Sequence, residues 1–128
     1  MKILLDTHII LWAAIASPKL PKEAAKLIED ECIEIYFSPA SLWEIVIKSS
    51  LQKEKFQADA RVLRRNLLDN NYIELPITSA HTVFIQTLPP IHKDPFDRIL
   101  VAQSTIEGIT LLTSDSTVAK YPGSIRLV

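Results

Sequence analysis

Cysteine is nearly absent from this sequence, and its scarcity excludes two classes of protein. Cys32 is the only cysteine among the 128 residues. A single thiol forms neither a disulfide framework nor a thiolate metal cluster, so the fold has to rest on its apolar core. A reducing compartment fits this composition, and we expect a cytoplasmic protein.

Long apolar runs are missing as well. No segment approaches the roughly 18 apolar residues of a membrane helix, so we expect no membrane contact. The N-terminus superficially resembles a signal peptide, with Lys2, an apolar stretch and the small-residue pattern Ala14-Ile15-Ala16. Asp6 replaces the basic lead of such a signal, and we therefore do not expect secretion.

An excess of charge of one sign is also absent. The formal net charge of -1 and pI near 6.3 give no global basic field, so a nucleic-acid contact would need a local patch. Between positions 48 and 65 basic residues outnumber Glu54 and Asp59; they are Lys48, Lys53, Lys55, Arg61, Arg64 and Arg65. The alternative for this segment is a solvated charged helix and loop.

The remaining composition is that of one globular domain. The chain is 48% hydrophobic and 23% charged, both normal for a soluble protein of this length. Because the sequence contains no repeat, low-complexity tract or linker, we expect residues 1–128 to form a single domain.

Short β-rich segments alternate with helical patterns. Predicted strands cover residues 2–5, 33–37, 72–75, 110–113 and 125–128. Predicted helices cover residues 7–16, 21–31, 40–50, 59–70, 78–87 and 95–107. This alternation favours βαβ units, and we predict an α/β fold of three layers, α/β/α, with a mostly parallel central sheet of four to five strands.

Four acids are expected at one edge of that sheet. The first strand stops at Asp6, and Asp115 follows the fourth strand. Asp97 lies in the first turn of its helix, and Glu44 interrupts an almost wholly apolar helix. Helices run antiparallel to the strands in such a fold, so their first turns meet the carboxyl ends of the strands, where ligands collect.

Each acid also has a simpler explanation. Asp6 is a good N-cap, Asp97 favours the dipole of its helix, and Asp115 is a common turn residue. Glu44 has Lys48 as an ordinary partner four residues later on the same helix. These alternatives stay open at the level of sequence.

Carboxylates gathered in one place raise one another's pKa values unless a cation compensates their charge. A set of acids without His or Cys favours Mg²⁺ or Mn²⁺ over zinc. The matching chemistry is hydrolysis of a phosphate ester, in which the metal lowers the pKa of a bound water and neutralises charge on the phosphate.

Four segments together resemble the PIN-domain ribonucleases of the VapC toxin kind. They are Asp6-Thr7-His8 with Trp12 downstream, Ser38-Pro39-Ala40-Ser41-Leu42-Trp43-Glu44-Ile45, His92-Lys93-Asp94-Pro95-Phe96-Asp97-Arg98 leading to Ala102, and Leu112-Thr113-Ser114-Asp115. The resemblance implies a PIN-like fold and a Mg²⁺- or Mn²⁺-dependent endoribonuclease. It also implies arrest of translation, a homodimer, and neutralisation by an antitoxin bound over the active site.

The resemblance also implies roles for individual residues. Asp6, Glu44 and Asp97 match the family's three core acids, and Asp115 matches its less constant fourth. Asp97 is chosen over Asp94 because a small residue falls five positions after it, as in the family pattern. Asp94 is interpreted as a helix cap.

Two hydroxyls complete the expected site. Thr113 matches a hydroxyl that the family often places beside the metal, and Thr7 stands where Ser, Thr or Asn is usual. The role of His8 is open, because the family varies at this position.

Basic side chains are candidates for guiding the RNA backbone. They are Lys53, Lys55, Arg61, Arg64, Arg65, His92 and Arg98. We expect products with 5′-phosphate and 3′-hydroxyl ends. The sequence does not identify the RNA target or the number of metal ions.

Three other functions share this fold class. A phosphoacceptor domain needs a phosphorylated Asp after its third strand, where this chain has Glu74-Leu75-Pro76. A haloacid-dehalogenase-like phosphatase needs an acid two residues after Asp6, where His8 stands. The third alternative is a non-catalytic RNA- or protein-binding module, against which the presence of all four acids argues.

Overall fold

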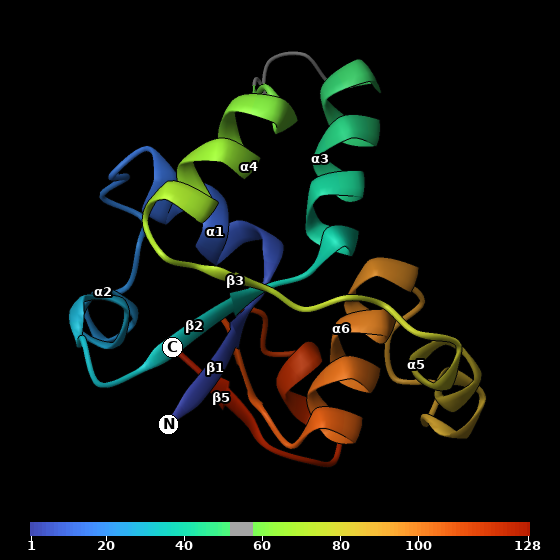
Figure 1. The fold of residues 1–128 in the computed structure, drawn as a ribbon. Coiled ribbons are helices and arrows are strands. Elements are labelled where there is room, and N and C mark those ends of the chain that lie inside the picture. The colour runs from blue at the N-terminus through green and yellow to red at the C-terminus, as the bar shows by residue number, and fades with distance from the viewer. Residues whose placement is uncertain (52–57) are drawn as a thin grey trace.

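A computed structural model describes residues 1–51 and 58–128 (Figure 1). Its centre is a sheet of five strands in the order β3-β2-β1-β4-β5. The strands are β1 (Lys2–Leu5), β2 (Glu34–Phe37), β3 (Ile73–Glu74), β4 (Thr110–Thr113) and β5 (Ile125–Leu127). Every neighbouring pair is parallel, so the sheet is more uniform than the mostly parallel one that we predicted.

Six α-helices surround the sheet in the described residues. They are α1 (Thr7–Ala14), α2 (Lys22–Glu29), α3 (Pro39–Leu51), α4 (Ala60–Asp69), α5 (Ser79–Phe84) and α6 (Pro95–Glu107). Short 3₁₀ turns cover Ile85–Thr87 and Val118–Lys120. Within these described residues, no helix combines the length and apolar character needed to cross a membrane.

Strand β1 separates two apolar cores. Ile3 and Leu5 pack with side chains of α1, α3 and α4 on one face of the sheet. Leu4 lies in the other core, with Leu100 and Val101 of α6. Alternate residues of a strand point to opposite faces, which explains why an unbroken apolar run serves both cores. The predicted three-layer α/β/α architecture is confirmed.

Several helices end earlier than predicted. Helix α1 stops at Ala14, and Ala16 has a φ of 49°, so the chain turns ahead of Ser17-Pro18. The residue before a proline avoids the helical region, which favours an early stop. The helix predicted over residues 78–87 divides into α5 and the 3₁₀ turn that precedes Leu88-Pro89.

Helix α6 begins and ends at the residues that the sequence marks. The Asp94 side chain accepts hydrogen bonds from the backbone N–H groups of Phe96 and Asp97. Gly108 adopts a φ of 66°, the left-handed conformation that closes many helices. These two residues fix where the first turn of α6 meets the sheet.

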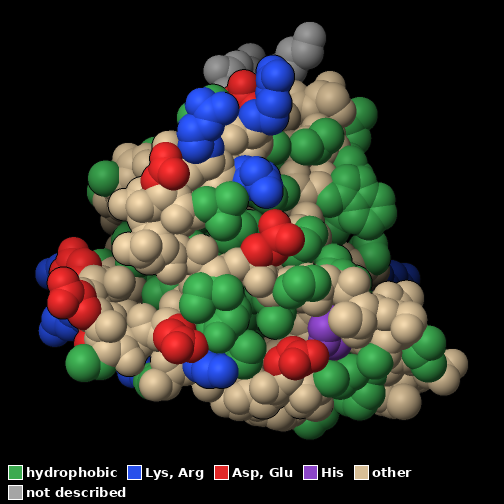
Figure 2. All heavy atoms as spheres, in the orientation of Figure 1, with side chains coloured by type: hydrophobic (Ala, Val, Ile, Leu, Met, Phe, Trp, Pro, Cys, Tyr) green, Lys and Arg blue, Asp and Glu red, His purple; other side chains and the backbone are tan. Residues whose placement is uncertain are grey.

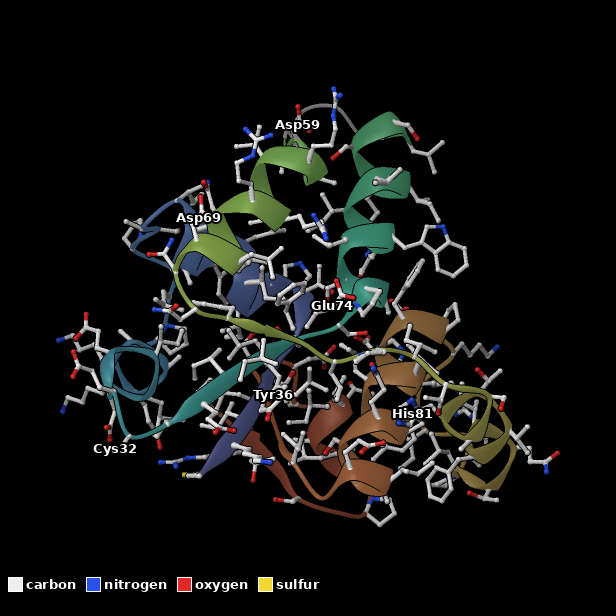
Figure 3. The ribbon with its side chains drawn as sticks, viewed as in Figure 1. Cys32, Tyr36, Asp59, Asp69, Glu74 and His81 are labelled. Carbon is white, nitrogen blue, oxygen red and sulfur yellow. The ribbon has the colours of Figure 1, made fainter. Side chains whose placement is uncertain are left out.

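A buried histidine joins α5 to α6 (Figure 3). His81 Nδ1 accepts the Thr78 N–H at 2.9 Å, as part of a capping box. Its Nε2 lies 2.7 Å from Glu107 Oε2 at the end of α6. His81 therefore takes part in the cap of α5 and links α5 to the end of α6.

Candidate metal centre

The carboxyl ends of β1 and β4 face the first turns of α1, α3 and α6, as the topology predicted. Asp6 follows β1, and Asp115 lies two residues beyond β4. Glu44 lies in the second turn of α3, and Asp97 is the third residue of α6. Four separate segments thus supply the predicted acids.

Asp6 caps α1, as one of its two interpretations predicted, and its other carboxylate oxygen lies beside Thr113. It is 5% exposed, and Oδ1 accepts the Ile9 N–H at 3.0 Å, which caps α1. Oδ2 accepts the Thr113 hydroxyl at 2.5 Å. Burial raises the pKa of the Asp6 carboxyl, while the bonds from Thr113 and Ile9 oppose that rise.

Glu44 is buried, with 2% of its surface exposed, and both carboxylate oxygens have partners. Oε1 accepts the Thr7 hydroxyl at 2.6 Å, and that hydroxyl also lies 3.0 Å from Ser41 Oγ. Oε2 accepts from Lys48 Nζ at 2.5 Å. The simple partner expected for Glu44 is therefore present.

The other acids also influence the pKa of Lys48. Burial alone would lower the pKa of its ammonium, but the hydrogen bond and charge of Glu44 raise the pKa above the ordinary value. The charges of Asp94 and Asp97 add to this rise. The Lys48 ammonium thus lies in the field of several carboxylates.

Asp97 is where the acids converge. Burial raises the pKa of its carboxyl, and the charges of Asp94, Glu44, Asp6 and Asp115 raise it further, to about 7. Only groups close in space exert such an effect, because charge interactions decline with distance and screening. The four predicted acids therefore form one electrostatic unit, and Asp94, the cap, adjoins it.

Asp115 is a turn residue that also faces this unit. Its Oδ1 accepts the Thr117 N–H at 2.8 Å, and its own N–H donates to the Thr113 hydroxyl oxygen at 3.0 Å. Because Thr113 also donates to Asp6, this hydroxyl ties the acid of β1 to the acid after β4. Thr113 thus lies beside the acids, where the resemblance placed it.

His92 joins the acids, a position that sequence reasoning missed. Its Nε2 lies 3.3 Å from Asp97 Oδ2 and 3.6 Å from Asp115 Oδ2, so the three side chains form a possible metal-binding group. Nδ1 accepts the Asp94 N–H at 3.1 Å, which puts the ring proton on Nε2. In that tautomer His92 donates toward the two carboxylates and does not offer Nε2 as a ligand. In the sequence, the signal for this position is that His92 lies two residues before Asp94, the residue that caps α6.

The Arg98 guanidinium binds backbone carbonyls rather than extending into solvent. Its guanidinium donates to the carbonyls of Ile85, Pro89 and His92 at 3.1 to 3.3 Å, and to Tyr121 Oη at 3.0 Å. Tyr121 Oη in turn accepts the His92 N–H at 2.9 Å. Arg98 therefore holds the loop that carries His92, and its predicted contact with RNA remains untested.

The predicted RNA-guiding residues of α4 line a surface hollow to which none of the four predicted acids contributes. Arg61, Arg64 and Arg65 are exposed and line a surface hollow with Leu68 and Asp69. Figure 2 shows basic side chains gathered over this end of the molecule, and Figure 3 places Asp59 and Asp69 at the two ends of α4. Lys53 and Lys55 lie outside the described residues.

His8, whose role the sequence left open, lies on the first turn of α1. It is exposed, and its ring stacks at a tilt on Trp12 with 5.7 Å between centroids. The charge of His8 lowers the pKa of Asp6 slightly against the larger effect of burial.

Comparison with known proteins agrees with this geometry. The model of the PIN domain matches residues 3–124, nearly the whole chain. The chain belongs to the PIN domain family. This membership places it among nuclease domains, which generally use divalent metal ions, and favours this assignment over the phosphatase and phosphoacceptor alternatives. No curated protein matches the sequence.

Solved structures share the fold of this PIN domain at low sequence identity. VapBC2 from Rickettsia felis, bound to a promoter DNA fragment, gives a TM-score of 0.71 at 18% identity, covering 99% of this chain and 98% of that one. DNA-bound VapBC from Salmonella typhimurium gives 0.67 at 14%, covering 100% and 97%. A toxin–antitoxin complex from Klebsiella pneumoniae gives 0.66 at 15%, covering 97% and 95%.

Proposed function

We propose that this PIN domain is a Mg²⁺- or Mn²⁺-dependent endoribonuclease and the toxin of a toxin–antitoxin pair. The observation that carries the proposal is that four segments bring these acids together: Thr113 bonds both Asp6 and the Asp115 N–H, and His92 lies between Asp97 and Asp115. Burial, and then the charges of Asp94, Glu44, Asp6 and Asp115, raise the pKa of Asp97 to about 7. Like charges brought this close are costly without a compensating cation, and an enzyme uses such an arrangement to hold one.

The side chains fit a hard divalent ion. The four acids offer carboxylate oxygens only, which suit Mg²⁺ and Mn²⁺. Asp6, Glu44 and Asp97 would hold the ion, with Asp115 assisting directly or through water. His92 in its Nε2–H tautomer would serve as a donor to Asp97 and Asp115 rather than as a ligand.

The chain's own residues orient this set of acids. The hydroxyls of Thr113 and Thr7 each donate to one carboxylate, which fixes Asp6 and Glu44 in direction. When bound, the divalent ion supplies an activated water and neutralises charge on the phosphate. In-line attack at phosphorus would leave 5′-phosphate and 3′-hydroxyl ends.

The RNA backbone would approach along basic side chains. Arg61, Arg64 and Arg65 are exposed on α4 and suited to phosphate contacts, with Lys53 and Lys55 nearby in sequence. Arg98 stays a candidate for contact with RNA, and its guanidinium also binds the backbone carbonyls of His92 and Ile85.

The expected protein partners are a cognate antitoxin and a second copy of the chain. Support for the antitoxin comes from the structural neighbours, which include VapBC and another toxin–antitoxin complex. Trp43, Val46 and Leu51 of α3 are 62%, 54% and 76% exposed, and large exposed apolar side chains suit association. We place this toxin in the cytoplasm, where its RNA substrate lies.

The test is cleavage of a mixed RNA pool by the purified chain with Mg²⁺ or Mn²⁺, beside a chelator control and Asp6→Asn. Asparagine still caps α1 through Oδ1, and its amide NH₂ can donate to the Thr113 hydroxyl oxygen. The variant should therefore fold while losing at least about a hundredfold in activity. Asp59→Asn removes an acid from the cap of α4 and should cut normally.

Wild-type cutting that survives the chelator, or full activity in Asp6→Asn, would contradict the proposal. A thermal unfolding curve of each variant shows whether lost activity reflects lost structure. Mapping the fragment ends then tests for 5′-phosphate and 3′-hydroxyl groups.

A further inference from the structure

Lys48 is a cation already present in the acidic centre. Its Nζ donates to Glu44 Oε2 at 2.5 Å, with the lysine side chain 34% exposed and that of Glu44 3% exposed. Lys48 lies four residues after Glu44 on α3, so its reach is set by the helix. An ammonium in this place carries its charge throughout the physiological pH range.

Both oxygens of Glu44 are committed. Oε1 accepts from Thr7, and Oε2 accepts from Lys48. A second cation can use Glu44 only by sharing it with the ammonium or by displacing it. The Thr7 hydroxyl is neutral and does not repel a metal ion. Of these two partners of Glu44, Lys48 is therefore the one that competes with the ion.

We infer that Lys48 is the internal counter-ion of the metal-free centre and competes with the divalent ion for Glu44. This inference rests on the proposed function, since it assumes that the acids hold a metal. In this role Lys48 stabilises the acids in the free protein and lowers the affinity for the ion. The lysine thereby sets the ion concentration at which the centre fills.

The alternative is a structural role in which Lys48 only orients Glu44. The two roles predict opposite signs. A lysine that orients a ligand strengthens metal binding, so its removal would weaken affinity. A lysine that competes weakens metal binding, so its removal would increase affinity.

The experiment is calorimetric titration of the full chain with Mn²⁺ alone, without RNA. Lys48→Met and Lys48→Gln keep a helix-compatible side chain and remove the charge. We expect each to bind Mn²⁺ about five- to tenfold more tightly than wild type, because a repelling charge near the ion is lost. Lys48→Arg keeps the charge and should stay within about twofold of wild type.

Lys26→Met is the matched control for net charge, because Lys26 is exposed on α2, away from the helices that carry the acids. Its affinity should not change. Thermal unfolding supplies a second measurement: without metal, Lys48→Met should melt below wild type, and Mn²⁺ should raise its midpoint more than that of wild type.

Unchanged or weaker Mn²⁺ binding in both uncharged variants, with wild type binding normally, would overturn the inference and leave the proposed function standing. If wild type itself binds no Mn²⁺ and no Mg²⁺, the proposed function fails and the inference fails with it.

Discussion

The pKa of Asp97 depends on burial and on the other acids of the centre. Burial and four neighbouring carboxylates raise its pKa from 3.8 to about 7. An Asp at the start of a helix would by itself be stabilised by the helix dipole, which was the simpler reading of this residue. Burial and the neighbouring charges raise the pKa of Asp97 despite its place in the first turn of α6, so the ionised side chain costs folding free energy here.

The raised pKa of Asp97 predicts that, in metal-free protein, the effect of Asp97→Asn on stability depends on pH. Between the unfolded pKa and the folded one, the folded protein binds the extra proton, so its stability falls as pH rises through that window. Asparagine does not titrate. The stability of the variant relative to wild type should therefore increase by about 2 kcal/mol between about pH 5 and about pH 8.

Urea unfolding in the presence of a chelator at both pH values measures this difference. Asp69→Asn, an exposed acid at the end of α4, is the control and should show no such dependence. A relative stability of Asp97→Asn that is the same at both pH values would show that Asp97 is not in the field of the other acids.

At the scale of elements, α6 is anchored at its first turn. Asp94 caps it, and Arg98 binds two carbonyls of the loop that precedes it and the carbonyl of Ile85 in the 3₁₀ turn before that loop. These bonds place His92 and Asp97 relative to each other. Sequence patterns predicted the cap from Asp94-Pro95, but a long-range guanidinium contact leaves no periodic signal.

Replacing Arg98 therefore tests the anchor. In Arg98→Met the carbonyls of Ile85, Pro89 and His92 lose a charged donor, and we expect a loss of about 2–4 kcal/mol in the free energy of unfolding. Arg64→Met, at an exposed position of α4, should cost less than about 0.5 kcal/mol. Urea unfolding compares the two, and equal small losses would show that the loop is held by other contacts.

At the scale of the whole molecule, topology explains why the sequence predicted so much. The apolar run of β1 and the strand–helix alternation indicate a buried parallel sheet, and that topology brings Asp6 and Asp115 to one edge before any side chain is placed. Glu44 was predicted from its place in an almost wholly apolar helix, and the resemblance then matched it to a core acid of the family.

The rest depends on packing between distant segments. The tautomer of His92 is set by the Asp94 N–H and its backbone by Tyr121, 29 residues away. The contact between His81 and Glu107 likewise joins residues that are 26 positions apart in the sequence. Helix ends and the division of α5 follow from local turns near proline, which pattern reading locates only approximately.

The most direct test of the central claim is anomalous diffraction from crystals of the full chain grown with Mn²⁺. The account predicts one or two Mn²⁺ peaks within coordination distance of carboxylate oxygens of Asp6 and Asp97, with Glu44 nearby. No peak at saturating Mn²⁺, or peaks only at other surface acids, would contradict the assignment of these residues as the metal centre.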